Sequence, residues 1–393
     1  MRRGRVGSFW PSRQQELLLR VALLENEHGE RAWSELTPQL DIQRLDAGST
    51  VLLPLLYERL RDNGAADPFL PRLKGVYRYV WYRNQIAMKA LLEMLAALRG
   101  AGIETIVFGG AALVTRYYRG LGVRPIDAPA VLVRPGQRQT AMTVLIQAGW
   151  TIAGGSGRSQ RLQPAEARDG RIAALHWRLP VEFEPASDDE SEEEVWGDAD
   201  ASDVQGAPTL TLNPSDELLL TCVGGTRSSS TCNVQWIPDA MKILRVSGSD
   251  IDWEKLIGKA VRRRRTLPML EALGYLTEAL HAPIPEWALT KLEATSVSRR
   301  ERLAQRISGR GGHILGNLPT TVGAHVVASQ DQSVLRAALA LPKFVGAEWG
   351  VDRISQLPLA AARRSAAAVS DAKARRRTRR LAQRQSSASS SGT

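Results

Sequence analysis

A pair of glycines lies where an apolar segment gives way to a helical one, and this placement suits a phosphate group. Gly109 and Gly110 follow the strand-like "IETIVF" (103–108), and "GAALVTRYY" (110–118) has helical spacing. Backbone N–H groups at a helix N-terminus lack partners within the helix, and the helix dipole favours an anion there. Glycines also let a phosphate approach the backbone closely. Gly109, Gly110 and Ala111 are therefore candidate nucleotide-binding residues, although a tight turn without a ligand would use the same residues.

A nucleotidyl transfer also needs divalent cations, and these cations need carboxylates. Two acids two residues apart on a strand project from one face and can hold a metal over a triphosphate, while a third acid from a neighbouring strand completes the site. The next apolar strand, "AVLVRP" (130–135), is where the acid pair is expected. The chain has Ala128, Pro129 and Ala130 there, with Asp127 beside them. The spacing fits a metal site, but alanine cannot coordinate a metal.

Together these segments resemble the uncharacterised nucleotidyltransferase family of the polymerase-beta-like superfamily. "GGAAL" (109–113) is similar to the family's first motif, and "RPIDAPAVLV" (124–133) is similar to its Arg-Pro run into Asp-x-Asp and a strand. "ALHWRL" (174–179) is similar to a later strand that ends in an acid-Leu-His-Trp-like sequence. "LNPSDELLL" and "WIPDAMKIL" resemble the C-terminal helical part. The resemblance covers roughly residues 10 to 295.

The resemblance implies a fold, a reaction and a cofactor. The implied fold is α+β or mixed α/β, with a nucleotidyltransferase-like core sheet between helical N- and C-terminal regions. The implied reaction transfers a nucleoside monophosphate from NTP and Mg²⁺ to an unknown acceptor, which is a protein, a small molecule or RNA. Ala128 and Ala130 fall at the Asp-x-Asp positions and Ala174 at the third acid position. Because these residues replace the metal ligands, we expect the chain as written to be inactive.

Other residues near the motif allow alternative readings. Arg124 precedes the metal strand and either pairs with the triphosphate or forms a salt bridge with the acidic loop. Asp127 faces away from the metal positions unless a bulge at Pro129 turns it. His176 is either a general base or a buried core residue.

Three further acids and two glycines also allow more than one interpretation. Glu182 and Glu184 are either substitute ligands or loop acids, and Asp239 is either a ligand or a residue that lies at the rim of the core or caps its helix. Gly109 stands where the family usually has lysine, and Gly224 stands where relatives tend to have histidine. These two glycines favour natural drift, whereas three alanines favour an inactivated variant, and both explanations stay open.

Hydrophobic periodicity divides the chain into four segments. We predict a helical region over 10–100, an α/β core over 101–212 and a second helical region over 213–307. Within the core, strands are expected at 103–108, 130–134, around 151–155 and at 171–179, with the acidic stretch 182–203 as a loop. Residues 308–393 form a poorly defined segment that ends in a basic, disordered tail.

An aromatic and arginine-rich stretch, "LKGVYRYVWYRNQ" (73–85), lies in the first helical region. Alternating rings and cations can bind a nucleotide or RNA. The same residues can instead pack between helices, which is the more usual role of such a stripe.

Composition limits the remaining classes of protein. The 393 residues include 43% hydrophobic and 24% charged residues, which is typical of a globular chain. Two cysteines provide neither a disulfide framework nor a four-cysteine zinc site. The apolar run near the N-terminus is broken by Arg20, and no run approaches the roughly 18 residues of a membrane span. We therefore expect a cytoplasmic protein with no membrane partner.

Three functions remain after these steps: a nucleotidyltransferase, a pseudoenzyme that binds a nucleotide or has a regulatory role, and a nucleic-acid-binding protein that uses its basic tail. The net charge of +11 only weakly supports the third, because the run 375–380 contributes much of it.

Overall fold

The computed structural model describes most of the chain between residues 10 and 362. The described ranges are 10–25, 27–64, 67–152, 162–180, 190–226, 234–309, 318–329, 334–349, 351, 354–359 and 361–362. Two of the sequence-based predictions fall outside these ranges: the loop acids Glu182 and Glu184, and the basic tail.

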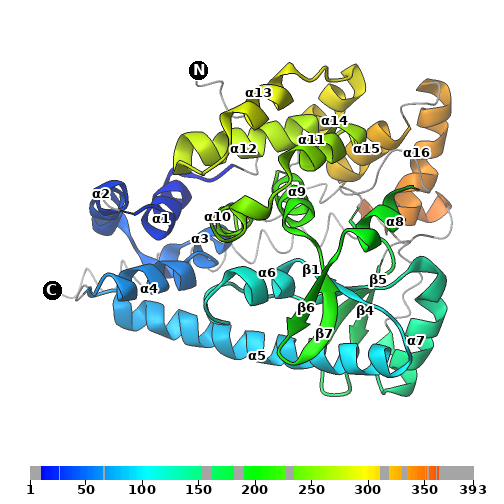
Figure 1. Cartoon of the computed structure of the whole chain (residues 1–393), viewed down its shortest axis with the longest axis horizontal. Helices are drawn as coiled ribbons and strands as arrows, with labels where there is room; N and C mark the ends of the chain where they lie inside the picture. Colours follow the sequence, from blue (N-terminus) through cyan, green and yellow to red (C-terminus); the bar gives the residue numbers. More distant parts are fainter. Residues whose placement is uncertain are drawn as a thin grey trace.

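In the described part of the chain, seven short strands form one mixed sheet (Figure 1). Their spatial order is β3 (Thr151–Ile152), β4 (Leu162–Glu166), β5 (Ile172–His176), β2 (Ala130–Leu132), β1 (Ile106–Phe108), β7 (Ala207–Thr211) and β6 (Asp200–Val204). β2 runs antiparallel to β1 and parallel to β5, and β1 runs parallel to β7. The mixed α/β fold and its predicted central strands are therefore confirmed.

The strand register brings the predicted site positions to one edge of the sheet. Phe108 at the end of β1 lies opposite Ala130 at the start of β2, and Ala130 lies beside Ala174 on β5. Paired residues in neighbouring strands project from the same face. Gly109 thus follows the end of β1, and Ala128 precedes the start of β2. These two strand ends meet at the same edge of the sheet.

One face of the sheet packs against α5 (Leu70–Gly100) and α7 (Arg138–Gln147) (Figure 1). The strand side chains on this face are apolar and buried, as shown by Val107, Val131 and Leu175. The 31 residues of α5 span about 46 Å. Its C-terminal half packs against the sheet, whereas its N-terminal half continues past the sheet to α4 (Leu53–Asp62).

The other face of the sheet packs towards α6 (Gly110–Tyr117), α9 (Pro214–Gly225) and α10 (Trp236–Val246). Ile106, Phe108 and Leu132 project from this face into a second apolar cluster. Ala130 and Ala174 project from this same face. Along β2 and β5 they alternate with Val131 and Leu175, which project towards α5.

The remaining helices surround these layers (Figure 1). They are α1 (Arg13–Leu23), α2 (Glu27–Leu36), α3 (Ala47–Thr50), α8 (Glu190–Gly197), α11 (Trp253–Arg262), α12 (Thr266–Leu280), α13 (Glu286–Ala294), α14 (Arg299–Gly309), α15 (Leu318–Ala328) and α16 (Val334–Trp349). Trp10 packs with its ring centroid 6.5 Å from Trp236 and 5.2 Å from Tyr275, so the N-terminal and C-terminal helices share one core. The predicted segment boundaries at 100 and 212 therefore remain a proposal about organisation.

The acidic stretch 182–203 is not only a loop, and that prediction is wrong for its second half. α8 and the edge strand β6 lie within it, and β6 forms a hairpin with β7. The turn residues Gln205 and Gly206 have φ values of 52° and 87°, as a two-residue hairpin turn requires. β4 was also not predicted, because Gln163, Pro164 and Glu166 interrupt its apolar pattern.

The aromatic stretch of α5 does not pack between helices as a whole. Tyr77 packs against Tyr57 of α4, with ring centroids 5.1 Å apart. Tyr79, Trp81 and Tyr82 are instead exposed by 60%, 46% and 61%. The packing interpretation is therefore wrong for these three side chains. No helix in the described ranges has both the length and the apolar character of a membrane span.

Candidate functional site

The turn from β1 into α6 has the backbone conformation that the glycine pair predicts. Gly109 is the residue before the helix, with φ 65° and ψ −142°, and Gly110 is its first residue. A side chain would strain the backbone at this φ, so glycine is required at position 109. Gly109 and Gly110 are partly exposed, whereas Ala111 is fully buried. The turn is therefore accessible at Gly109 and Gly110 and closed at Ala111.

The three alanines that the resemblance places at the acid positions come together on one face of the sheet. Ala130 and Ala174 are direct partners across β2 and β5, and the Ala174 N–H donates to the Pro129 carbonyl oxygen at 2.8 Å. Ala128 is two residues before Ala130, in an exposed bend. We call Ala128, Ala130 and Ala174 the alanine face.

The alanine face does not provide ligands for Mg²⁺. A hard cation needs several oxygen ligands, and the three methyl groups offer none. Glu166 of β4 is on this face, but it pairs with Ile172, two pairs along from the Ala174–Pro164 pair. Among the described residues there is no group of three or more Asp, Glu, His or Cys side chains that could hold a metal. The residues present therefore do not fit the metal that the family implies.

Asp127 and His176 do not replace the missing acids. Asp127 is exposed in the bend before Ala128 and belongs to no metal-binding group in the described chain. His176 is buried, and its ring packs edge-on against Phe108, with centroids 4.9 Å apart. Burial lowers the pKa of His176 from 6.5 to about 4, so the ring is neutral at pH 7. His176 has the environment of a core residue.

Arg124 makes its main contacts with the helical region behind the site. Its Nε donates to Asp239 Oδ1 at 2.7 Å and its Nη2 donates to Oδ2 at 2.8 Å. The Tyr118 hydroxyl donates to the same Oδ1 at 2.7 Å. Burial lowers the pKa of Arg124, but the adjacent Asp239 carboxylate more than offsets this, so the net shift is upward. Arg124 thus pairs with α10 rather than with the acidic loop, and Asp239 is a buried ion-pair partner rather than a residue at the rim of the core.

The same guanidinium lies against the glycine pair. A Cβ atom built on Gly110 would come within 2.7 Å of Arg124 Nη1, whereas one on Gly109 would meet nothing within 4 Å. Glycine at 110 is therefore needed to admit the arginine. Arg124 is beside the helix N-terminus where a phosphate would bind, although Asp239 already neutralises much of its charge.

A buried asparagine fixes the loop that carries Arg124. Asn84 of α5 is fully buried, and its Oδ1 accepts the Ile126 N–H at 2.9 Å. Its Nδ2 donates to the Arg124 carbonyl oxygen at 2.7 Å. Sequence reasoning missed this role because Asn84 is within the aromatic stretch, 40 residues before Arg124. A polar residue on the buried side of that helix was the available signal.

Glu217 of α9 is the second residue that sequence reasoning missed. Its carboxyl group is fully buried, and neither oxygen has a hydrogen bond of ordinary geometry among the described residues. Burial raises the pKa of Glu217 from 4.5 to about 8, while Arg116, Arg124 and the nearby Gly109 N–H act in the opposite direction. The carboxyl is therefore mostly protonated at pH 7 and adds little negative charge beside Gly109.

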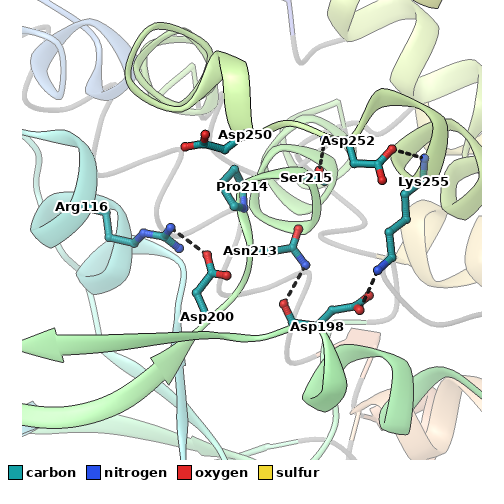
Figure 2. Close-up of a pocket in the computed structure, with 9 residues that line it drawn as sticks. All are labelled: Arg116, Asp198, Asp200, Asn213, Pro214, Ser215, Asp250, Asp252 and Lys255. Atoms are coloured by element: carbon teal, nitrogen blue, oxygen red, sulfur yellow. Dashed lines mark hydrogen bonds and ion pairs between the residues drawn. The ribbon is translucent and has the colours of Figure 1, made fainter.

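A cavity of about 400 Å³ lies near the other end of α6 (Figure 2). Its walls are formed by Arg116, Asp198, Asp200, Asn213, Pro214, Ser215, Asp250, Asp252 and Lys255. Arg116 binds Asp200 at 3.0 Å, and Lys255 binds Asp198 at 2.6 Å. Most of its charged groups are thus already paired with one another, and we assign it no ligand.

The sheet is mixed and enclosed by helical regions, and a strand–Gly-Gly–helix turn lies at the edge where β2 begins. Together these features define a nucleotidyltransferase-like protein. The chain belongs to the family described as uncharacterised nucleotidyltransferase, whose sequence pattern matches residues 38–281. No protein with a curated function matches it in sequence.

Two solved structures are similar to the chain at low identity. The solution structure of the antibiotic-resistance factor ANT(2'')-Ia has 15% identity and a TM-score of 0.34, and the match covers 49% of this chain and 98% of that one. The crystal structure of an antigenic nucleotidyltransferase-like protein from Paracoccidioides brasiliensis has 12% identity and a TM-score of 0.34, with 52% and 97% covered.

Proposed function

We propose that the chain is a non-catalytic member of its family, which binds the phosphates of a nucleotide without transferring the nucleotide. The alanine face carries this proposal: Ala130 and Ala174 are side by side, next to Ala128, where the family resemblance places carboxylates. A metal-dependent transfer would need those ligands to bind the cation and to activate the acceptor hydroxyl.

The phosphate-binding half of the site, which consists of Gly109, Gly110, Ala111 and Arg124, supports retained nucleotide binding. Gly109 and Gly110 are partly exposed at the start of α6, and the Arg124 guanidinium lies against Gly110. The protonated Glu217 leaves the positive end of the helix uncompensated below about pH 8. Phosphate contacts at this end do not depend on a metal.

A binding experiment with and without metal tests the proposal. ATP is titrated into the full chain by calorimetry, once with Mg²⁺ and once with EDTA, and transfer of labelled nucleotide is measured in parallel. We expect similar affinity in both conditions and no transfer. Transfer by the unmodified chain would overturn the non-catalytic assignment, and failure to bind ATP in either condition would overturn the nucleotide-binding assignment.

A pair of glycine variants locates the binding. Gly109→Ala is expected to weaken ATP binding about tenfold or more, because the turn must change to accept the side chain. Gly102→Ala is the matched control, since Gly102 also has a positive φ, of 68°, with open space around it, before β1. Equal losses in both variants would argue against binding at the start of α6.

Acid substitutions test the lost catalytic function. Ala128→Asp with Ala130→Asp should make ATP binding stronger in Mg²⁺ than in EDTA, and adding Ala174→Glu should be needed for transfer. Ala201→Asp on the exposed edge strand β6 is the control for added negative charge. A folded triple variant that binds ATP identically in Mg²⁺ and EDTA would show that the alanine face is not a former metal site.

A further inference from the structure

The N-terminal half of α5 carries exposed aromatic and basic side chains that no contact in the fold explains. Tyr79, Trp81 and Tyr82 are exposed by 60%, 46% and 61%. In Figure 1, α5 lies along the lower edge of the molecule, and its N-terminal half extends beyond the sheet under α4. Large exposed rings on a helix that is already packed on its other side are unusual in a soluble chain.

The inner side of these same helical turns is complete without the exposed rings. Val80 and Asn84 are buried, and Tyr77 packs on Tyr57. A Cβ on Gly122 would come within 2.5 Å of the Tyr77 ring, so this ring fills the available space against the loop. The exposed faces of Tyr79, Trp81 and Tyr82 therefore lie outside this packing.

The charge of the same face has one sign. Between residues 70 and 92, α5 contains Arg72, Lys74, Arg78, Arg83 and Lys89 and no acid; its first acid is Glu93. All five cations are exposed, and none forms an ion pair with another described residue. Arg83 donates to the Tyr79 hydroxyl at 3.3 Å, which places a guanidinium beside an exposed ring.

Helical geometry spreads these side chains over about half of the helix circumference, as a broad strip. At 100° per residue, Arg78, Tyr82 and Lys89 lie close to one line along the helix, with Tyr79 and Arg83 on one flank and Trp81 and Lys74 on the other. Residues 72–89 extend over about 26 Å. We call this strip, with Arg72, the aromatic–basic face.

We propose that the aromatic–basic face of α5 binds a single-stranded polynucleotide. Flat exposed rings can stack with unpaired bases, and the cations between them can contact successive phosphates. A duplex would offer the phosphates but not the faces of its bases. A membrane-surface helix has a broad apolar face of Leu, Phe and Trp, and this part of α5 exposes no Leu, Ile, Val or Met beside its three rings. The proposal rests on α5 alone and does not depend on nucleotide binding at α6.

The test uses the full chain and fluorescently labelled 20-nucleotide RNA and DNA, single-stranded and duplex, at several salt concentrations. Tyr79→Ala with Trp81→Ala and Tyr82→Ala should weaken single-strand binding about tenfold or more, because each stacked base contributes to affinity. Since this variant keeps every charge, its salt dependence should change little. Trp287→Ala, at a tryptophan exposed by 47% on α13, is the matched control.

The charge substitutions give an independent readout. Arg78→Ala with Arg83→Ala should reduce the slope of log affinity against log salt by about 1.4, at about 0.7 for each phosphate contact. Arg306→Ala, an exposed arginine on α14, should leave the slope unchanged. These are surface positions, and circular dichroism should confirm that all variants fold.

The results that would overturn the proposal are equally specific. Unchanged single-strand affinity in the triple aromatic variant would assign any binding to another basic segment, such as the tail. Preference for duplex over single strands would exclude stacking. Binding to anionic phospholipid vesicles without polynucleotide binding would make the face a membrane contact instead.

Discussion

The proposed phosphate-binding half and the alanine face lie at the same edge of the sheet, yet they differ in how they are built into the fold. Arg124 has two short hydrogen bonds to Asp239, and its loop is fixed by Asn84. The alanine face has backbone contacts between strands, the packing of Ala130 against the apolar core and one exposed bend. The first region therefore stabilises the protein whether or not it binds a ligand, whereas the second has no structural role that depends on acids.

This difference gives a physical reason for an acid-free site in an intact fold. Three carboxylates close together repel one another when no metal is bound, so replacing them removes a destabilising interaction. Replacing Arg124 or Asp239 would instead leave its partner buried and uncompensated. A protein that no longer needs the metal can lose the acids at little cost to stability, but it must keep the ion pair.

The largest effect is expected from Asp239→Ala. It would leave the mostly buried Arg124 and the Tyr118 hydroxyl without their acceptor, and the free energy of unfolding should fall by about 3–5 kcal/mol. Urea denaturation measures this change. Asp200→Ala is the matched control, because its partner Arg116 also bonds to Thr211 and Leu212, and this partly exposed pair should contribute less than about 1 kcal/mol. Equal losses in the two variants would remove the contrast between the two regions.

Glu217→Gln should change how stability depends on pH. The folded pKa of about 8 exceeds the reference value of 4.5, so the folded state holds a proton that the unfolded chain releases between these values. Stability conferred by this group is therefore present below about pH 4.5 and is lost as pH rises towards about 8. We expect the free energy of unfolding of the unmodified chain to fall by about 3–5 kcal/mol across this window relative to Glu217→Gln, at about 1.4 kcal/mol for each pKa unit.

Urea denaturation at several pH values between 5 and 9 measures this difference. Comparing the two proteins isolates position 217, because Glu271 and Glu301 also have raised pKa values in both. The charged groups near Glu217 are Arg116 on α6, Arg124 in the loop before β2, and Asp239 on α10. Parallel pH profiles would show that Glu217 is not protonated beside Gly109.

The triple acid variant, with Ala128→Asp, Ala130→Asp and Ala174→Glu, should be less stable than the unmodified chain by about 1–3 kcal/mol in EDTA. Mg²⁺ should restore part of this loss by binding only the folded state. Thermal unfolding with and without Mg²⁺ measures both changes. Ala128→Asn with Ala130→Asn and Ala174→Gln has the same size without charge, and it should show no response to Mg²⁺. A Mg²⁺ response in the neutral variant would contradict the assignment.

The sequence predicted the parts of the site that depend on local pattern. The apolar runs 103–108 and 130–134 specified two neighbouring strands, and two glycines specified the turn into α6. The contacts that decide the roles of side chains are distant in sequence: Arg124 and Asp239 are 115 residues apart. No periodicity reports such a pair. The acidic hairpin strand β6 was missed because its partners are distant too: Asp200 at its start pairs with Arg116 of α6, 84 residues earlier in the chain.

The smallest effect is expected at Gly224, where the family resemblance places histidine. Gly224 is exposed on α9, and a Cβ there would meet nothing within 4 Å. Gly224→Ala should therefore raise the free energy of unfolding by about 0.5–1 kcal/mol, because alanine favours a helix more than glycine does. The adjacent Gly225 is the internal control: its Cβ would come within 2.0 Å of the Trp236 ring, so Gly225→Ala should destabilise by about 1–3 kcal/mol. Chemical denaturation of the two variants thus tests whether the fold requires a particular residue at position 224, which it does not at the alanine face. A loss of stability in Gly224→Ala would place that glycine with Arg124 and Asp239, among the residues that the fold itself requires.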